Sequence, residues 1–237
     1  MGLRIAGGVF TFRLVPTLTT LLLIIILIGL GTWQVQRAAW KENLIATIEV
    51  QRHTKPIDLA ATKNITIDPS YRPAFATGQF LYDKTLYMSA ISLKGEGGYH
   101  VLTPLKLTDG RRLIVNRGFV PYDKKQAVSE PKGKVKIAGI LRVPVKAGWS
   151  APANQPATNV WYSIDLRSMA LATGVPAFLP YVLDVQASDP TIYPIGGQTR
   201  FDLPNNHRGY ALTWYSLAFV LLVIYGLSSW QPRKKKQ

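Results

Sequence analysis

The chain has 237 residues, 47% of them hydrophobic, and carries a formal net charge of +15. It contains no cysteine, which excludes disulfides and thiolate-bound metals. Its length suits one or two domains, and its apolar residues are concentrated near the two ends of the sequence.

Residues 14–36 form the first apolar run, which contains 23 residues and no charge. As a helix this run would reach about 35 Å, enough to cross a hydrocarbon core about 30 Å thick. It ends in aromatic and cationic residues that are typical of a membrane boundary, Trp33, Arg37 and Trp40. The length of the run and these end residues argue against a buried soluble helix. Because the end is not a small-residue cleavage site, we interpret the run as an uncleaved signal anchor rather than a cleaved signal peptide.

Residues 209–232 form a second uncharged run, of 24 residues, and four adjacent cations follow it at 233–236. The positive-inside rule places such a basic tail in the cytoplasm, and two crossings then place both termini on that side. The predicted organisation follows the chain: cytoplasmic N-terminus 1–13, first span 14–36, extracytoplasmic domain 37–208, second span 209–232 and basic cytoplasmic tail 233–237. The corresponding membrane is the bacterial inner membrane, or the mitochondrial inner membrane in a eukaryote.

The connection between the two runs, residues 38–208, is strongly basic. It holds 21 basic and 13 acidic residues, a net charge of +8. Such a surface favours anionic lipid headgroups or an acidic protein partner. Nucleic acid is not an expected partner outside the cytoplasm.

The extracytoplasmic domain is predicted to be rich in strands. A helix continues from the first span over 38–50, and about 20 residues without a periodic pattern follow it. Aromatic and β-branched residues then predict strands at 71–80, 85–93, 100–107, 112–119 and 135–143. Asp109-Gly110 has the two-residue signature of a type I′ hairpin.

The rest of the domain is predicted to add one helix and one strand. Residues 144–158 are rich in proline and alanine and indicate an exposed loop, and 164–173 indicate a helix with Asp165 as N-cap and Gly174 after its end. A last strand is expected at 178–186. The predicted fold class is a membrane α+β protein, in which two transmembrane helices flank a mostly antiparallel β domain with one or two helices.

The sequence contains none of the common catalytic motifs. H-E-x-x-H, G-x-S-x-G, the phosphate-binding loop and the dinucleotide fingerprint are all absent, and the histidines are far apart. Neither predicted span carries a charge, so an intramembrane proton relay has no support. We therefore expect a membrane-tethered binding or assembly protein and not an enzyme.

His207 is the strongest candidate for a binding residue, because it lies at the predicted outer end of the second span. On a helix, Tyr210 and Trp214 are three and seven residues further on and share its face. A neutral imidazole beside aromatic surface suits an axial haem ligand, and Arg208 could pair with a haem propionate. The alternative is an interfacial histidine within an ordinary aromatic belt.

Arg117 is a cation in an otherwise apolar predicted strand. It is either paired within the fold or presents its charge to a partner. On the second interpretation Arg117, Gly118 and Arg200 are candidate docking residues.

Several segments, taken in order along the chain, resemble the Surfeit locus protein one (Surf-one) family. They are 30–37 (LGTWQVQR), 71–73 with Gly78, 101–105 (VLTPL), 115–121 (VNRGFVP), 161–162, 194–200 (PIGGQTR) and 205–215. Each segment alone has low specificity, whereas their order together with the two spans is highly specific.

The resemblance implies an assembly factor for haem–copper cytochrome c oxidase. It further implies a role in the maturation of subunit I, with haem a as a transient cofactor, haem a synthase as a second partner and His207 at the position associated with haem binding. A structural chaperone of the subunit I intermediate that never binds haem is the alternative. Copper delivery is not expected, since Cu(I) carriers use cysteine and methionine ligands and the three methionines here are scattered.

Overall fold

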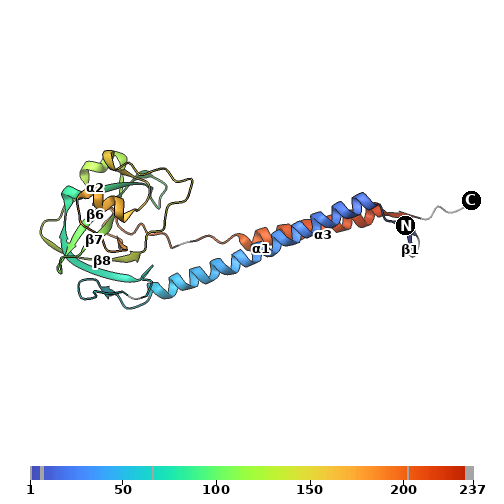
Figure 1. Ribbon diagram of the computed structural model, residues 1–237, viewed down its shortest axis with the longest axis horizontal. Coiled ribbons are helices and arrows are strands. Elements are labelled where there is room, and N and C mark those ends of the chain that lie inside the picture. The colour runs from blue at the N-terminus through green and yellow to red at the C-terminus, as the bar shows by residue number, and fades with distance from the viewer. Residues whose placement is uncertain (1, 6–7, 66, 202, 233–237) are drawn as a thin grey trace, which may run out of the picture. The chain divides into compact units, whose positions relative to one another are not determined.

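The computed structural model describes residues 2–5, 8–65, 67–201 and 203–232. The chain divides into two compact units (Figure 1). One contains residues 1–46 and 203–237, and the other contains residues 47–202.

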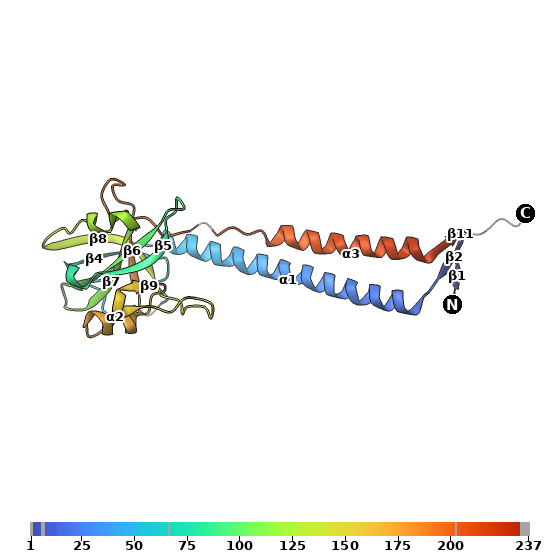
Figure 2. The same ribbon diagram turned by 90° about the horizontal axis from the view of Figure 1, so that it is seen from above.

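Two helices in the described residues of the first unit are long and apolar enough to cross a membrane. They are α1, Leu14–Arg52, and α3, His207–Ser229. They run side by side in the views of Figures 1 and 2. Most of their apolar side chains are exposed, as at Ile25 and Phe219, although the apolar face of a soluble helix is normally buried. Length, composition and exposure thus support a membrane protein.

The ends of these helices differ from the charge-free runs. The predicted continuation over 38–50 is confirmed, because α1 extends without a break to Arg52. α3 begins two residues before the predicted 209 and ends at Ser229, three residues before the predicted 232. Proline at 232 disfavours the helical conformation of the residue that precedes it, which explains the early end.

A small antiparallel sheet forms from residues that were predicted as the N-terminal tail (1–13) and as the end of the second span (209–232). It contains β1 (Gly2–Ile5), β2 (Gly8–Thr11) and β11 (Trp230–Pro232), with β2 in the centre. Its third strand comes from the other end of the chain, so no local pattern could have predicted the pairing.

The second unit is built on an eight-stranded sheet within the described residues. Its strands are β3 (Ile57–Asp58), β4 (Pro73–Phe80), β5 (Leu86–Ile91), β6 (Gly97–Leu107), β7 (Arg112–Pro121), β8 (Lys134–Arg142), β9 (Val160–Trp161) and β10 (Val182–Val185). Their order is β3-β4-β8-β10-β7-β6-β5-β9, and a further pairing of β4 with β6 closes five of them into a ring. Short 3₁₀ helices cover Tyr82–Lys84, Tyr122–Ala127 and Pro156–Thr158.

The predicted class, a mostly antiparallel β domain with few helices between two apolar helices, is confirmed. The five strands predicted from 71 to 143 are all present, and the strand expected at 178–186 is shorter, at Val182–Val185. β10 pairs in parallel with β7 and antiparallel with β8. The ring closure and the parallel pairing join segments far apart in the sequence and were not predicted.

The hairpin between β6 and β7 is confirmed, but its predicted type I′ turn is wrong. Within the fully described loop only Gly110 has a positive φ, +89°, whereas a type I′ turn needs positive φ at both central residues. The N–H of Gly110 donates to the Leu107 carbonyl (3.0 Å), and the N–H of Leu107 donates to the Arg111 carbonyl (2.9 Å). The loop thus has three residues and ends in a left-handed glycine. The Asp109 carboxylate accepts from the N–H and Nε of Arg111.

β7 is the central strand of the domain and is buried on both faces. Leu113 and Val115 belong to a core with Leu183, whereas Ile114 packs on the opposite face with Trp161 and Met169. Alternation places successive side chains on opposite faces, so a strand with two covered faces is almost continuously apolar.

Helix α2, Leu166–Thr173, covers the second face and has the predicted caps (Figure 1). The Asp165 carboxylate accepts from the N–H groups of Arg167 and Ser168, both at 3.1 Å. Gly174 follows the helix in the left-handed conformation. Both capping predictions are confirmed.

Candidate functional site

His207 is the first residue of α3 and is half-buried. Between His207 and Tyr225, the buried and half-buried residues of α3 follow at alternating steps of four and three, at Ala211, Trp214, Ala218, Leu221 and Tyr225. This spacing keeps them on one helix face, as in coiled coils. The equivalent positions of α1 include Gly31, Gln34 and Ala38. His207 therefore begins the face through which α3 contacts α1.

The imidazole of His207 is oriented by a glutamine of α1. His207 Nδ1 lies 2.7 Å from Gln34 Oε1. An amide oxygen only accepts hydrogen bonds, so in this orientation Nδ1 carries the proton and donates it. In the neutral ring the remaining nitrogen, Nε2, then has a lone pair. Metal-bound histidines are held in the same way, with one ring N–H donated to an oxygen and the other nitrogen directed at the metal.

Further hydrogen bonds fix the segment that leads into α3. Asn205 Nδ2 donates to the carbonyl of Ala38 (3.1 Å), and Lys41 Nζ donates to the carbonyl of Pro204 (2.5 Å). Further along the helices, α1 and α3 approach closely at Gly31. A Cβ at this position would lie 2.6 Å from the Tyr215 ring. The segment that leads into α3 and the α1 helix that faces it are thus held together by hydrogen bonds donated from both sides.

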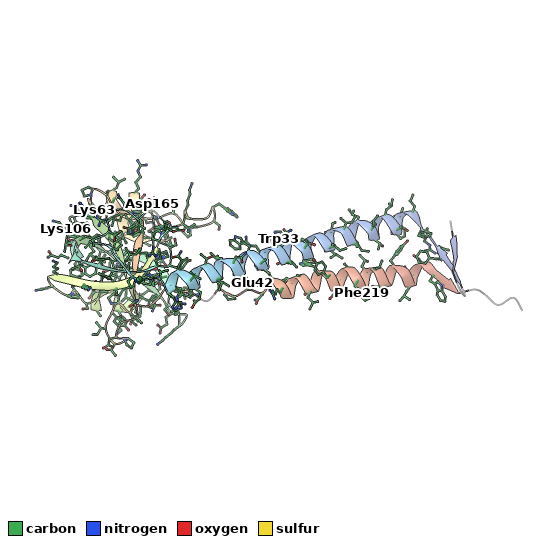
Figure 3. The ribbon with its side chains drawn as sticks, turned by 90° about the horizontal axis from the view of Figure 1, so that it is seen from below. Trp33, Glu42, Lys63, Lys106, Asp165 and Phe219 are labelled. Carbon is green, nitrogen blue, oxygen red and sulfur yellow. The ribbon has the colours of Figure 1, made fainter. Side chains whose placement is uncertain are left out.

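Arg208 already has a carboxylate partner. Its Nε lies 2.9 Å from Glu42 Oε1 and its Nη2 lies 3.0 Å from Oε2. Glu42 is labelled on α1 in Figure 3. Both side chains are well exposed, at 77% for Arg208 and 43% for Glu42, so the pair is weak and exchangeable. A ligand carboxylate at Arg208 would have to displace Glu42.

The two predicted aromatic neighbours of His207 differ in position. Trp214 is half-buried on the inner face, whereas Tyr210 is 58% exposed and lies away from that face. Of the four residues predicted for the haem site, His207 and Trp214 thus share a face, Arg208 is engaged with Glu42, and Tyr210 points outward.

The donor set suits haem better than a bare metal ion. The described residues contain no group of three or more histidine, cysteine or acidic side chains that could hold a metal. A single histidine is a weak site for a free cation. Haem iron already has four porphyrin nitrogen ligands and needs only one or two axial ligands from protein. A neutral imidazole with a free Nε2 fits that requirement.

In the second unit, Arg117 is held within the fold. It is 8% exposed, its Nη2 donates to the Ser129 carbonyl, and its guanidinium lies 5.1 Å from the ring centroids of both Phe80 and Tyr82. Burial lowers the pKa of this guanidinium. This geometry corresponds to the first of the two interpretations of Arg117, a cation paired inside the fold.

Gly118 and Arg200 have different environments. Gly118 has a φ of +129°, and a Cβ there would lie 2.2 Å from the carbonyl oxygen of Ile195. The backbones of Phe119 and Ile195 exchange two hydrogen bonds, of 2.9 and 2.8 Å, so Gly118 allows this close approach. Arg200 is exposed and donates to the carbonyl of Ser92 (3.2 Å).

A buried carboxylate joins the segment that follows β10 to the sheet. Asp184 on β10 accepts from Asn116 Nδ2 (3.0 Å), from Nε and Nη2 of Arg142 (2.8 and 3.1 Å) and from Thr199 Oγ1 (3.2 Å). Because every lone-pair direction of such a carboxylate is in use, this network is structural and leaves no position for a ligand.

Gln34 and Glu42 are the partners that sequence reasoning missed. Gln34 is one of two glutamines at the end of the uncharged run 14–36 and lies in the segment 30–37 that carries the family resemblance. Since polar side chains within membrane helices usually serve as hydrogen-bonding partners, that position was a usable signal. Nothing in the sequence indicated that Glu42 pairs with Arg208, 166 positions away.

Comparison with known proteins gives one consistent result. The model of the SURF1 family matches residues 21–219. Surfeit locus protein 1 of Mus musculus is 39% identical over 209 residues, covering 80% of this chain and 67% of the relative. That of Homo sapiens is 37% identical over 211 residues (80% and 69%), and a SURF1-like protein of Monosiga brevicollis is 34% identical over 218 residues (85% and 82%). The match includes both residues of the Gln34–His207 hydrogen bond, and the chain belongs to the SURF1 family.

Proposed function

We propose that this protein is a membrane-anchored assembly factor for haem–copper cytochrome c oxidase. Membership of the SURF1 family and two helices suited to crossing a membrane support this role. The basic domain would lie outside the cytoplasm, with both termini inside, in the bacterial inner membrane or the mitochondrial inner membrane. Its partners would be oxidase subunit I and haem a synthase.

We further propose that the protein binds haem a through His207 Nε2 and aids its insertion into subunit I. The observation that carries this proposal is the hydrogen bond from His207 Nδ1 to Gln34 Oε1. In the neutral ring this bond selects the tautomer with the proton on Nδ1, which leaves on Nε2 the lone pair that axial ligation needs.

Each neighbouring residue would have a distinct part in binding. Gln34 orients the imidazole, and Trp214 supplies apolar surface on the same face of α3. Arg208 would exchange Glu42 for a propionate, since its present ion pair is exposed. A site at the end of a membrane helix would let an apolar cofactor move laterally between membrane partners.

A structural chaperone of subunit I that does not bind haem is the second candidate. The same hydrogen bond favours it in one respect, because His207 and Gln34 satisfy each other and join two helices without any ligand. The two candidates therefore differ in one measurable property, the presence of haem on the purified protein.

The test is the absorption spectrum of the protein purified from cells that make haem a. We expect the wild type to show a haem spectrum and His207→Ala to lose it. We expect Gln34→Leu to lower haem occupancy and change the position of the Soret band, because the imidazole loses its orienting acceptor. His53→Ala is the matched control, since His53 follows the end of α1, is exposed, and its ring lies against the nearby Glu49 carboxylate.

A colourless wild type, or a His207→Ala protein that stays fully loaded, would contradict haem binding at this site. If His207→Ala still supported oxidase maturation as well as the wild type, the chaperone role would be the better account. The amount of each variant in the membrane is measured alongside, so loss of protein is not mistaken for loss of haem.

A further inference from the structure

A cavity of about 320 Å³ lies in the second unit, between strands β4 and β8 and the segment after β10. Its walls are mainly apolar, with Phe80, Val135, Ile137 and Ile192 among them. Arg117 and Lys136 also line it. The volume is at the lower end of ligand-binding pockets, of a size for one or two side chains rather than a large cofactor.

Arg117 brings to this cavity a positive charge that no carboxylate of the described residues contacts directly. No carboxylate in the described part of the chain forms an ion pair with it, and its Nη1 is buried without a hydrogen-bond partner among the described residues. Burial lowers its pKa, yet an arginine remains protonated in proteins. The rings of Phe80 and Tyr82 and the exposed Glu130 carboxylate, which forms no ion pair with Arg117, stabilise the cation only in part, so no carboxylate in the described ranges contacts this buried charge directly.

The other charged groups at the cavity do not supply a counter-ion that contacts Arg117. The Asp189 carboxylate accepts from the N–H and Oγ1 of Thr191, at 2.8 and 2.7 Å, and these bonds lower its pKa. Lys136 Nζ lies over the Phe75 ring at 4.6 Å. Lys132 and Lys134 are exposed in the segment that leads into β8. The cavity and its approach therefore favour an anion.

We propose that this cavity binds an acidic side chain of a protein partner. In the partner's sequence this acidic residue lies next to an apolar residue. A guanidinium matches the geometry of a carboxylate, and the apolar walls can accept the neighbouring side chain. An aspartate or glutamate presents its carboxylate on a narrow stem. A phospholipid would have to bring its phosphate into the same apolar space with both ester arms attached, which the small volume disfavours.

This proposal is independent of haem binding, because it concerns the β domain and His207 lies in the other unit. It also gives Arg117 a second role. The side chain is packed within the fold, and it retains a binding capacity that the fold itself does not use.

The experiment selects peptides from a random displayed library on the full chain in phosphatidylcholine nanodiscs. We expect the selected peptides to contain aspartate or glutamate beside an apolar residue. Replacing that acid by its amide should weaken the peptide's Kd about tenfold or more, as for other buried charge pairs. Arg117→Gln should abolish the preference for acids, whereas Arg167→Gln, at an exposed arginine of α2 outside the cavity, should retain it.

A second pair of variants keeps the test valid if Arg117→Gln fails to fold. Ile192 is 52% exposed at the cavity, so Ile192→Glu adds a competing negative charge there and should abolish the preference. Leu171→Glu makes the same change at a 78% exposed position on α2, outside the cavity, and should leave the preference intact.

The proposal is wrong if acids are not enriched, or if Ile192→Glu selects them as strongly as Leu171→Glu does. Competition by vesicles that contain phosphatidylglycerol tests whether the cavity binds a lipid instead. If they displace a selected peptide from the wild type and bind the wild type more tightly than the Ile192→Glu protein, the cavity binds a lipid phosphate and the protein-partner assignment is overturned.

Discussion

At the scale of single residues, the side chains of His207 and Gln34 meet although they lie 173 positions apart. Each belongs to a segment that the sequence already marked, the outer end of the second apolar run and the polar end of the first. The imidazole alone would be an ordinary interfacial histidine. The Gln34 amide oxygen accepts the proton on Nδ1, so in the neutral imidazole Nε2 is the nitrogen whose lone pair can bind a metal.

His100 is a second histidine whose environment has a measurable consequence. It lies on β6, half-buried, with its ring in edge contact with Phe119 and its Nδ1 buried without a partner among the described residues. Burial lowers its pKa from 6.5, an effect that Asp184 opposes and Arg142 reinforces. The folded protein therefore favours the neutral ring more than the unfolded chain does.

We predict that acid destabilises the domain through His100. As the pH falls below 6.5, the unfolded chain gains a proton there before the folded protein does, so the free energy of unfolding decreases until the lower folded-state pKa is reached. Thermal unfolding midpoints of the purified protein in detergent, measured from pH 7.5 downwards, report this loss. His100→Gln should flatten the profile, and His53→Gln should retain it. An unchanged slope in His100→Gln would contradict the assignment.

At the scale of elements, the contact between α1 and α3 depends on a small residue. A Cβ at Gly31 would lie 2.6 Å from Tyr215, whereas one at Gly29 would meet nothing within 4 Å. Thr32 Oγ1 lies 3.2 Å from the Tyr215 hydroxyl, and Thr17 Oγ1 lies 2.5 Å from that of Tyr225. The two glycines look alike in the sequence, but only one of them faces the other helix.

We predict that Gly31→Leu separates the two helices and Gly29→Leu does not. Overpacking at such a contact costs about 1–3 kcal/mol. Because the chain has no native cysteine, a Thr17→Cys/Tyr225→Cys pair can be joined by a bifunctional maleimide without side reactions. The yield of cross-linked protein should fall in the Gly31 variant and stay at the parent level in the Gly29 variant. Equal yields would show that the contact does not depend on Gly31.

The β6–β7 hairpin shows the limit of a local motif. Asp109-Gly110 correctly predicts a reversal of the chain, because glycine accepts the positive φ that the turn needs. The turn type depends on where the strand pairing starts, and Leu107 pairs with Arg111, which places three residues in the loop. Pairing register is set by both strands and their cores, which a dipeptide does not contain.

At the scale of the whole molecule, the predicted membrane topology can be tested directly, because the sequence has no cysteine and an introduced cysteine is therefore its single thiol. Leu171→Cys places a thiol at a 78% exposed position of the domain, and Arg13→Cys places one just before α1. We predict that a membrane-impermeant maleimide labels the first in intact spheroplasts and the second only after lysis. Labelling of Arg13→Cys in intact spheroplasts would contradict the cytoplasmic N-terminus. The tail 233–237, on which the orientation was predicted, lies outside the described residues.

The sequence by itself determined the two apolar helices, the position of most strands, the caps of α2 and His207 as the candidate ligand. Each of these follows from local information: an uncharged run, alternation of apolar residues, a carboxylate before a helix, a histidine beside aromatic residues. The family resemblance likewise depends on short segments in order, and it was confirmed.

Only the tertiary structure decided which distant groups meet. It closed the ring through the β4–β6 pairing, placed Gln34 against His207 and Glu42 against Arg208, and enclosed Arg117 without a carboxylate partner. The physical reason is the same in each case. Hydrogen bonds, ion pairs and burial act over a few ångströms of space, and a sequence pattern reports only neighbours along the chain or on one face of a single element.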